Sequence, residues 1–150
     1  MSIPISVSSD PTSLTIVCCV EAGVLEPMVI RMVESLRRHG GSWAQTPVWA
    51  ITPRFGPSIA RATREKFSQL SIEHRVIREP HPYQWFGMWN KIAAVSYAEE
   101  HAQTEYMAFI DSDVLFTGEP DQLVGSDFSA CVHGNQHLGT TGPGDANEPL

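Results

Sequence analysis

Four short runs of apolar and β-branched residues divide most of the chain. They span residues 14–20, 48–52, 72–77 and 106–110. The first, second and fourth runs have almost no polar alternation, a pattern typical of strands that are covered on both faces, as in a parallel sheet. The third run is interrupted by His74 and Arg75 and predicts a weaker strand. A fifth run, at residues 128–132, predicts a last strand.

Amphipathic segments separate these strands. A first helix is predicted to begin at Pro27, because proline suits the first helical position. Its apolar residues recur at helical spacing, its last turn is basic, and Gly40-Gly41 ends it. Two longer helices are predicted at residues 58–70 and 83–101, the second of which opens on a run of aromatic residues. After the strand of residues 106–110, the apolar residues 114–116 continue the extended chain, and residues 120–123 predict a short helix.

The alternation of strands and helices predicts the fold class. This order is typical of an α/β, Rossmann-like fold, in which a mostly parallel sheet carries helices on both faces. We expect a flexible lead-in over residues 1–13, one α/β domain over residues 14–132 and a loop-rich tail over residues 133–150. Because the chain ends in a loop with no element to close the domain, we expect it to be part of a longer protein.

Composition limits the class of protein. The chain has 150 residues, of which 42% are hydrophobic, enough for one domain with a buried core. No apolar run approaches the ~20 residues of a membrane span, and no leader of basic and then apolar residues opens the chain. The three cysteines contain no C-x-x-C pair, which favours free thiols in a reducing compartment. We therefore expect a cytoplasmic protein without a transmembrane segment.

The charges are distributed unevenly. Residues 1–91 carry ten basic and seven acidic side chains, a net charge of +3, whereas residues 92–150 carry ten acidic and no basic side chains, a net charge of −10. An acidic half repels a phosphorylated ligand unless a cation bridges the two. No dense basic stripe is present, which disfavours nucleic acid as the main partner.

Two carboxylates, Asp111 and Asp113, directly follow the strand of residues 106–110. In open α/β sheets, ligands bind beyond the carboxyl ends of the strands. Two acids in one short turn repel each other, and a divalent cation removes that cost. Aspartate oxygens suit Mg²⁺ or Mn²⁺, which proteins often bind through one or two carboxylates together with substrate phosphates. The turn is therefore the candidate metal site.

The segment around this turn resembles glycosyltransferases of the GT-A fold, which carry a D-x-D motif after a buried strand. The similarity rests on Asn90-Lys91-Ile92-Ala93-Ala94, Thr104-Glu105-Tyr106, Asp111-Ser112-Asp113 and the segment from Pro120 to Leu123. In element order it extends over residues 14–132. The resemblance implies transfer of a sugar from a nucleoside diphosphate donor, linked to UDP or GDP, to an acceptor that the sequence does not identify. It also implies an N-terminal portion of such an enzyme, with residues 133–150 as the start of the acceptor region.

The resemblance also assigns roles within the site. In this family the D-x-D carboxylates hold a divalent metal on the diphosphate of the donor. Asp113 would be a direct ligand of Mn²⁺ or Mg²⁺, and Asp111 would share the metal or contact the ribose or donor sugar. Lys91 would lie near the phosphates or sugar of the donor, and Glu21, after the first strand, near its base and ribose. A histidine beyond the motif sometimes completes the metal shell, and His133 is the candidate here.

Other polar and aromatic residues have two interpretations each. Arg54 and Arg61 follow the second strand on the ligand side of a parallel sheet, where Arg54 in particular would steady donor phosphate; the competing interpretation for both is a surface role. Trp85, Phe86 and Trp89 would stack on a sugar ring, although such clusters more often belong to the core, and we expect at least two of them there. No residue is assigned as the general base.

Several alternatives to a transferase remain open. His133 and His137 have an H-x₃-H spacing, which with Asp113 would make a two-histidine, one-carboxylate iron site. A haloacid dehalogenase-like phosphatase would use Asp111 as a nucleophile, but its D-x-D usually opens the chain. A non-catalytic nucleotide-binding or scaffold module is the other alternative. No P-loop, G-x-G-x-x-G, H-E-x-x-H or G-x-S-x-G motif is present.

Overall fold

The computed structural model describes residues 11–77, 86–120 and 123–124 of the chain. The elements, in chain order, are η1 (Pro11–Ser13), β1 (Leu14–Cys19), α1 (Leu25–His39), η2 (Gly41–Gln45), β2 (Val48–Thr52), α2 (Arg61–Gln69), β3 (Ile72–Val76), α3 (Trp89–His101) and β4 (Tyr106–Phe109). The four strands predicted between residues 14 and 110 are therefore present. The strand predicted at residues 128–132 and the tail of residues 133–150 lie outside the described residues.

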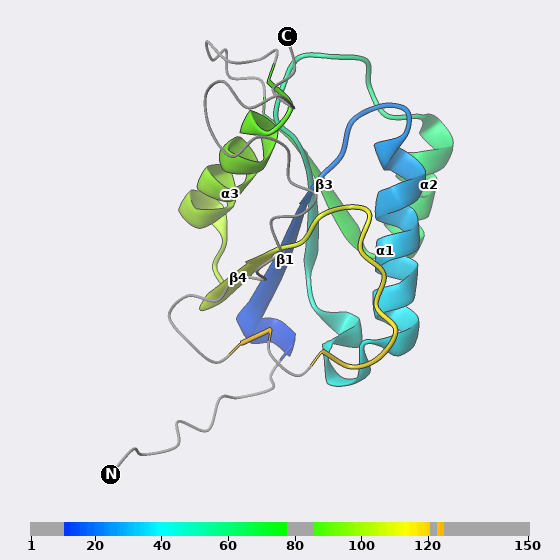
Figure 1. The fold of residues 1–150 in the computed structure, drawn as a ribbon, viewed down its shortest axis with the longest axis vertical. Coiled ribbons are helices and arrows are strands. Elements are labelled where there is room, and N and C mark those ends of the chain that lie inside the picture. The colour runs from blue at the N-terminus through cyan, green and yellow to red at the C-terminus, as the bar shows by residue number, and fades with distance from the viewer. Residues whose placement is uncertain (1–10, 78–85, 121–122, 125–150) are drawn as a thin grey trace, which may run out of the picture.

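The four strands form one sheet with the order β3-β2-β1-β4, and every neighbouring pair is parallel. In the register, Ile16 of β1 lies opposite Val48 of β2 on one side and Ala108 of β4 on the other. Figure 1 shows α1 and α2 on one face of this sheet and α3 on the other. The predicted α/β, Rossmann-like fold with helices on both faces is thus confirmed.

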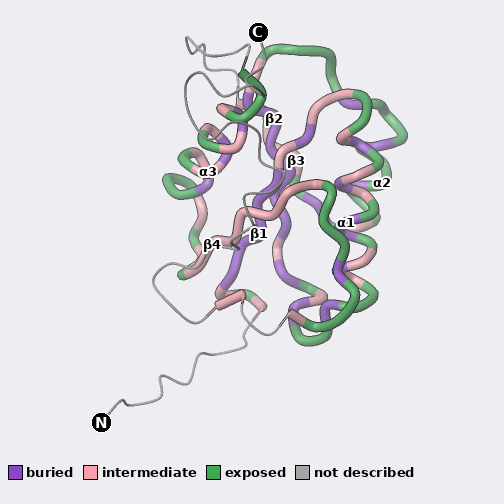
Figure 2. The backbone as a smooth tube through the Cα atoms, in the orientation of Figure 1, coloured by how far each residue is buried: buried purple, intermediate pink, exposed green. Residues whose placement is uncertain are grey.

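The larger part of the core lies between the sheet and the pair α1 and α2. The predicted apolar face of α1 is buried: Val29, Met32, Val33 and Leu36 have no exposed surface. Phe67 of α2 packs into the same cluster, whose sheet residues include Leu14, Ile16 and Cys18. Because burying one such side chain contributes about 1.5–3 kcal/mol, this face fixes the two helices against the strands. Figure 2 shows that β1 and β2 are buried between helices whose outer surfaces are largely exposed.

A smaller core lies between the sheet and α3. Ala94 and Ala98 have no exposed surface and contact Val17 and Ile51 in one cluster, so that α3 lies directly on β1 and β2. At its edge, the Arg75 guanidinium stacks 3.4 Å above the Trp49 ring. In the described part of the chain, no helix has the length and apolarity that a bilayer span requires.

Three predicted helix boundaries need correction. α1 begins at Leu25, two residues before Pro27, which is tolerated because the first-turn amides lack helical partners. α2 begins at Arg61 because Ala60 has an extended ψ of 151°. α3 begins at Trp89, after a turn that includes Phe86. Of Trp85, Phe86 and Trp89, at least two were predicted to lie in the core. Phe86 does not, because it is 47% exposed. Trp89 is half-buried, and Trp85 lies outside the described residues.

The chain leaves the sheet after β4. The Ile110 amide still donates to the Val17 carbonyl at 2.9 Å, and then the Val114 amide closes a turn on the Asp111 carbonyl at 3.2 Å. Residues 114–116 then continue the chain outside any strand. Phe116 instead packs into the core beside α1, and its amide donates to Ser35 Oγ at 2.9 Å. Figure 1 shows this segment crossing in front of α1.

Its last part is attached to η2. The Glu119 carboxylate accepts hydrogen bonds from the amide and the hydroxyl of Ser42, and these bonds lower the pKa of Glu119. Of the short helix predicted at residues 120–123, residues 121–122 lie outside the description, while Pro120 and Leu123 are not helical.

Candidate functional site

The site lies where the strand order reverses. β1 has β2 on one side and β4 on the other, and the chain leaves β1 and β4 at the same edge of the parallel sheet. Ligands of open α/β sheets bind in the crevice at such a switch point, beyond the carboxyl ends of the strands. Glu21 follows β1 and Asp111 follows β4, so the order and direction of the strands bring these two predicted site residues to one edge.

The first turn of α3 adds a cation to this edge. Lys91 Nζ donates to Asp111 Oδ2 at 2.7 Å. The two side chains are 36% and 47% exposed, so both atoms of the ion pair can be reached from solvent. The structure therefore brings together two residues that lie 20 positions apart and that the sequence had separately assigned to the donor site.

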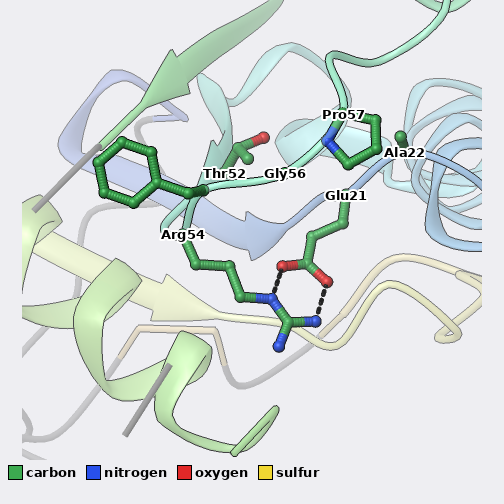
Figure 3. A pocket seen from close by; sticks show the side chains of 7 residues that line it. Glu21, Ala22, Thr52, Arg54, Gly56 and Pro57 are labelled. Carbon is green, nitrogen blue, oxygen red and sulfur yellow. Dashed lines mark hydrogen bonds and ion pairs between the residues drawn. The ribbon is translucent and has the colours of Figure 1, made fainter. Parts of the chain in front are cut away.

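A second ion pair joins the ends of β1 and β2. Arg54 Nη2 donates to Glu21 Oε2 at 2.7 Å, and Arg54 Nε donates to Glu21 Oε1. Figure 3 shows this two-point contact, with the guanidinium extending from the loop after β2 toward the Glu21 carboxylate. The hydrogen bonds from Arg54 to Glu21 raise the pKa of the guanidinium, which stays charged. Both predicted residues thus lie at the strand ends and neutralise each other.

Asn90 connects the Glu21–Arg54 pair to α3. Its side-chain amide donates to Glu21 Oε1 at 3.1 Å, and its backbone carbonyl accepts from the Cys19 thiol at 3.4 Å. Asn90 is only 5% exposed, and its Oδ1 atom is buried without a hydrogen-bond partner among the described residues. The sequence places Asn90 in the segment that resembles glycosyltransferases but assigns it no role. Its position directly before Lys91 is the feature of the sequence that suggests a place in the site.

The pKa of Cys19, at the end of β1, depends on the charges around it. Burial, and then the negative charges of Glu21 and Asp111, raise the pKa of its thiol to about 12, although Lys91 acts in the opposite direction. The thiol therefore stays protonated at neutral pH and is neither a nucleophile nor a base. Cys19 thus lies between Glu21 and the Lys91–Asp111 pair, and the charges of all three act on its thiol.

A cavity of about 320 Å³ opens next to the Glu21–Arg54 pair. It is lined by Glu21, Ala22, Thr52, Arg54, Phe55, Gly56 and Pro57. Its size lies at the lower end of the range for small-molecule sites. Phe55 is 56% exposed, which leaves an aromatic face available to a flat ligand. By contrast, Arg61 is exposed on α2 and pairs with Glu65, so it has the surface role that was its competing interpretation.

Asp111 and Asp113 fit a divalent cation as an open site. Asp113 is exposed in the turn that the Val114 amide closes, and the Asp111 carboxylate already attracts the Lys91 ammonium. Within residues 11–77, 86–120 and 123–124, no group of three or more His, Cys, Asp or Glu side chains is placed to hold a metal by itself. A cation here would need further oxygens from substrate and water, as Mg²⁺ commonly does. His133, the predicted third ligand, and His137 lie outside the described residues.

A buried carboxylate near the site was not predicted. Glu26 is 8% exposed, and its two oxygens accept from the Gly23 amide and the Ala60 amide, each at 2.8 Å, and from the Thr63 hydroxyl. It therefore satisfies donors at the starts of both α1 and α2. Burial alone would raise its pKa, but these hydrogen bonds and the charge of Arg64 lower it. Glu26 stabilises the frame beneath the cavity.

The parallel sheet, with a cavity and four polar side chains at its switch point, defines an α/β ligand-binding domain of the Rossmann-like class. Comparison with known families identifies it further: the model of the Rhodobacterales glycosyltransferase domain matches residues 16–143. The chain therefore belongs to this glycosyltransferase family, which confirms the prediction of a glycosyltransferase domain. No curated protein matches the chain. Family membership favours a transferase over the phosphatase and iron-site alternatives.

Proposed function

We propose that this domain transfers a sugar from a nucleoside diphosphate donor to an acceptor and binds the donor at the switch point between β1 and β4. The observation that carries the proposal is the meeting of Glu21, Arg54, Lys91 and Asp111 at that edge, in a chain of a glycosyltransferase family. We expect the region beyond residue 132 to contribute to the acceptor side of this reaction.

Asp113 and Asp111 are the residues that would hold Mn²⁺ or Mg²⁺. The support is chemical: two aspartates follow one buried strand, and one of them is exposed in a turn at the ligand edge. When bound, the metal would neutralise the leaving diphosphate as its bond to the sugar breaks. Among side chains of the described part, Lys91 is the cation in contact with Asp111, so its ammonium could donate to the same diphosphate.

The Glu21–Arg54 pair and the cavity beside it would take the nucleoside. A carboxylate is a suitable acceptor for ribose hydroxyl groups, and one Glu21 oxygen also accepts from the buried Asn90, which keeps the carboxylate in place. Arg54 can donate to phosphate or to a base carbonyl from the same position. Phe55, exposed on the cavity, offers a face on which a base can stack.

The test is a calorimetric titration of UDP and of GDP into the protein, each with and without Mn²⁺. We expect binding that requires Mn²⁺, and the nucleotide that binds identifies the donor. Asp113→Ala should abolish the metal-dependent part, whereas Glu99→Ala, which removes an exposed acid of α3 outside the site, should leave it within about twofold. If a folded protein binds neither nucleotide in the presence of Mn²⁺, the donor-site proposal is wrong.

A separate measurement distinguishes the transferase from a non-catalytic module. Release of UDP or GDP from the matching nucleotide-sugar, with water as the acceptor, would show bond cleavage. Binding without any such release, in both the presence and the absence of Mn²⁺, would favour the nucleotide-binding module.

A further inference from the structure

A second cavity, of about 200 Å³, lies beside the first at the ends of β2 and β3. The two cavities share Thr52, Arg54, Gly56 and Pro57. The second one continues away from Glu21 and Asp111 toward the start of α2, and the residues added there include Ser58, Arg64 and His74. It therefore lies next to the proposed donor site but is built largely from other side chains.

The second cavity is basic. Among the described residues that line it, the ionisable side chains are Arg54, Arg64 and His74, and no carboxylate is present. Arg64 donates to the Ile59 carbonyl and forms no ion pair in the described part of the chain. The charge of Arg64 helps to lower the pKa of Glu26, whose two oxygens are occupied by three hydrogen bonds. Because Arg54 is paired with Glu21, the positive charge of this cavity comes mainly from Arg64.

The hydrogen bonds of Thr52 determine which nitrogen of His74 carries the proton. The single hydroxyl proton of Thr52 is donated to the Val20 carbonyl at 2.8 Å. The Thr52 oxygen can therefore only accept from His74 Nε2, which lies 2.9 Å away. Neutral His74 thus has its proton on Nε2 and a free lone pair on Nδ1. Protonation of Nδ1 would add a second donor without breaking the bond to Thr52.

The field in the cavity acts on this histidine. Burial and then the charge of Arg64 lower the pKa of His74, so the imidazole is neutral at pH 7. The charged groups that share the cavity with it are Arg54 and Arg64; from α2, Phe67 packs edge-on against its ring. A group that carried negative charge into the cavity would reverse this effect.

We propose that the second cavity binds a phosphate-type oxyanion without a metal, with Arg64 and His74 as its main contacts. Arginine suits phosphate because its planar group donates two parallel hydrogen bonds. The hydroxyl of Ser58, which also lines the cavity, adds a donor. The phosphate is either a free ion or a group of a nucleotide in the neighbouring cavity.

The test is a titration of inorganic phosphate, in the absence of metal, followed by calorimetry and by the NMR signals of the histidine rings. We expect Arg64→Gln to weaken phosphate binding by about tenfold or more, the loss of one charge-assisted contact. Arg61→Gln is the matched control, because Arg61 lies on the same helix, is exposed and pairs with Glu65. That variant should bind phosphate as the wild type does.

Two further readouts separate this site from the donor site. At a phosphate concentration that just saturates the wild type, the pKa of His74 should rise in the wild type and stay nearly unchanged in Arg64→Gln. Asp113→Ala should bind phosphate normally, so the proposal of an anion site is tested independently of the proposed function.

If phosphate and UDP with Mn²⁺ bind at the same time, the natural ligand of the cavity is a free ion. If they compete, it is a phosphate of the nucleotide. No phosphate binding by folded wild-type protein, or an equal loss in Arg61→Gln, would overturn the proposal.

Discussion

Lys91 Nζ lies 2.7 Å from Asp111 Oδ2, and both side chains are partly open to solvent. The ammonium therefore occupies an oxygen of the carboxylate that we propose as a metal contact. A divalent cation and Lys91 should compete for Asp111 in the absence of a nucleotide, because two cations at one carboxylate repel each other.

The first prediction follows from this competition. Lys91→Met should tighten the binding of Mn²⁺ to the nucleotide-free protein by about three- to tenfold, and should weaken the binding of UDP or GDP in saturating Mn²⁺. Calorimetry measures both. Lys66→Met is the control, because Lys66 is exposed and pairs with Glu34 at 3.7 Å on the other face of the sheet. Weaker Mn²⁺ binding by Lys91→Met would show that Lys91 supports the metal site rather than competing for it.

The second prediction concerns the geometry of the Glu21–Arg54 pair. Arg54→Lys keeps the charge but cannot make two parallel hydrogen bonds, so we expect nucleotide affinity to fall by about tenfold. Global stability should change by less than about 1 kcal/mol, because the two side chains are 31% and 22% exposed and solvent screens the pair. Calorimetry gives the affinity, and urea unfolding gives the stability. Wild-type affinity in Arg54→Lys would show that charge alone matters at this position.

The third prediction concerns the buried carboxylate of Glu26. Glutamine has one acceptor oxygen, so Glu26→Gln leaves the Gly23 or the Ala60 amide without its partner and should cost about 1–3 kcal/mol at pH 7. Urea unfolding measures this difference. The exposed Glu34 of the same helix provides the control, and Glu34→Gln should cost less than about 0.5 kcal/mol.

The pH dependence of this effect has a definite sign. Because hydrogen bonds lower the pKa of Glu26 in the folded state, the carboxylate binds protons more weakly there than in the unfolded chain. Its stabilising contribution is present above the ordinary glutamate pKa and is lost as the pH falls through the lowered value. The difference between wild type and Glu26→Gln should therefore shrink as the pH is reduced below about 4. A difference that grows on acidification would contradict this assignment.

The fourth prediction is that Cys19 is chemically inert. With a thiol pKa of about 12, its thiolate fraction at pH 8 is smaller than that of an ordinary cysteine by a factor of about 1,000 or more. Alkylation of Cys19 by iodoacetamide, followed by mass spectrometry of the peptide, should be at least about 100-fold slower in the folded protein than in urea. Cys19→Ala should retain nucleotide binding. Rapid alkylation in the folded state would mean that the thiol is activated.

The sequence predicted the strands better than the contacts between elements. Residues 48–52 were expected as a strand and form β2, because an unbroken apolar run can only be buried on both faces. Residues 114–116 could not be interpreted as fully, since a short apolar run also suits a chain that packs across a helix, as Phe116 does beside α1. Local patterns indicate which residues are buried, but they do not indicate which helix, strand or loop covers them.

The candidate site likewise contains residues whose position the sequence predicts and contacts that it does not predict. The D-x-D turn could be placed at the ligand edge because it follows a buried strand, and Lys91 was placed near the donor by the family resemblance. The 2.7 Å contact between Lys91 and Asp111 agrees with that placement. The Glu21–Arg54 pair spans 33 positions, and the bond from Asn90 to Glu21 spans 69. These partners depend on the depth at which α3 lies on the sheet and on the loop after β2, which no periodicity encodes.

The segment after β4 has a consequence for the energetics of ligand binding. It is anchored at Ile110, whose amide bonds to β1, and again at Phe116, whose amide bonds to Ser35 and whose ring is buried. Only residues 111–115 lie between the two anchors, and both aspartates are among them. A span this short has few conformations to lose when a ligand fixes it, so little of the binding free energy is consumed in ordering the chain. The backbone that carries the two carboxylates is therefore fixed at both ends before the metal and nucleotide that we propose can bind.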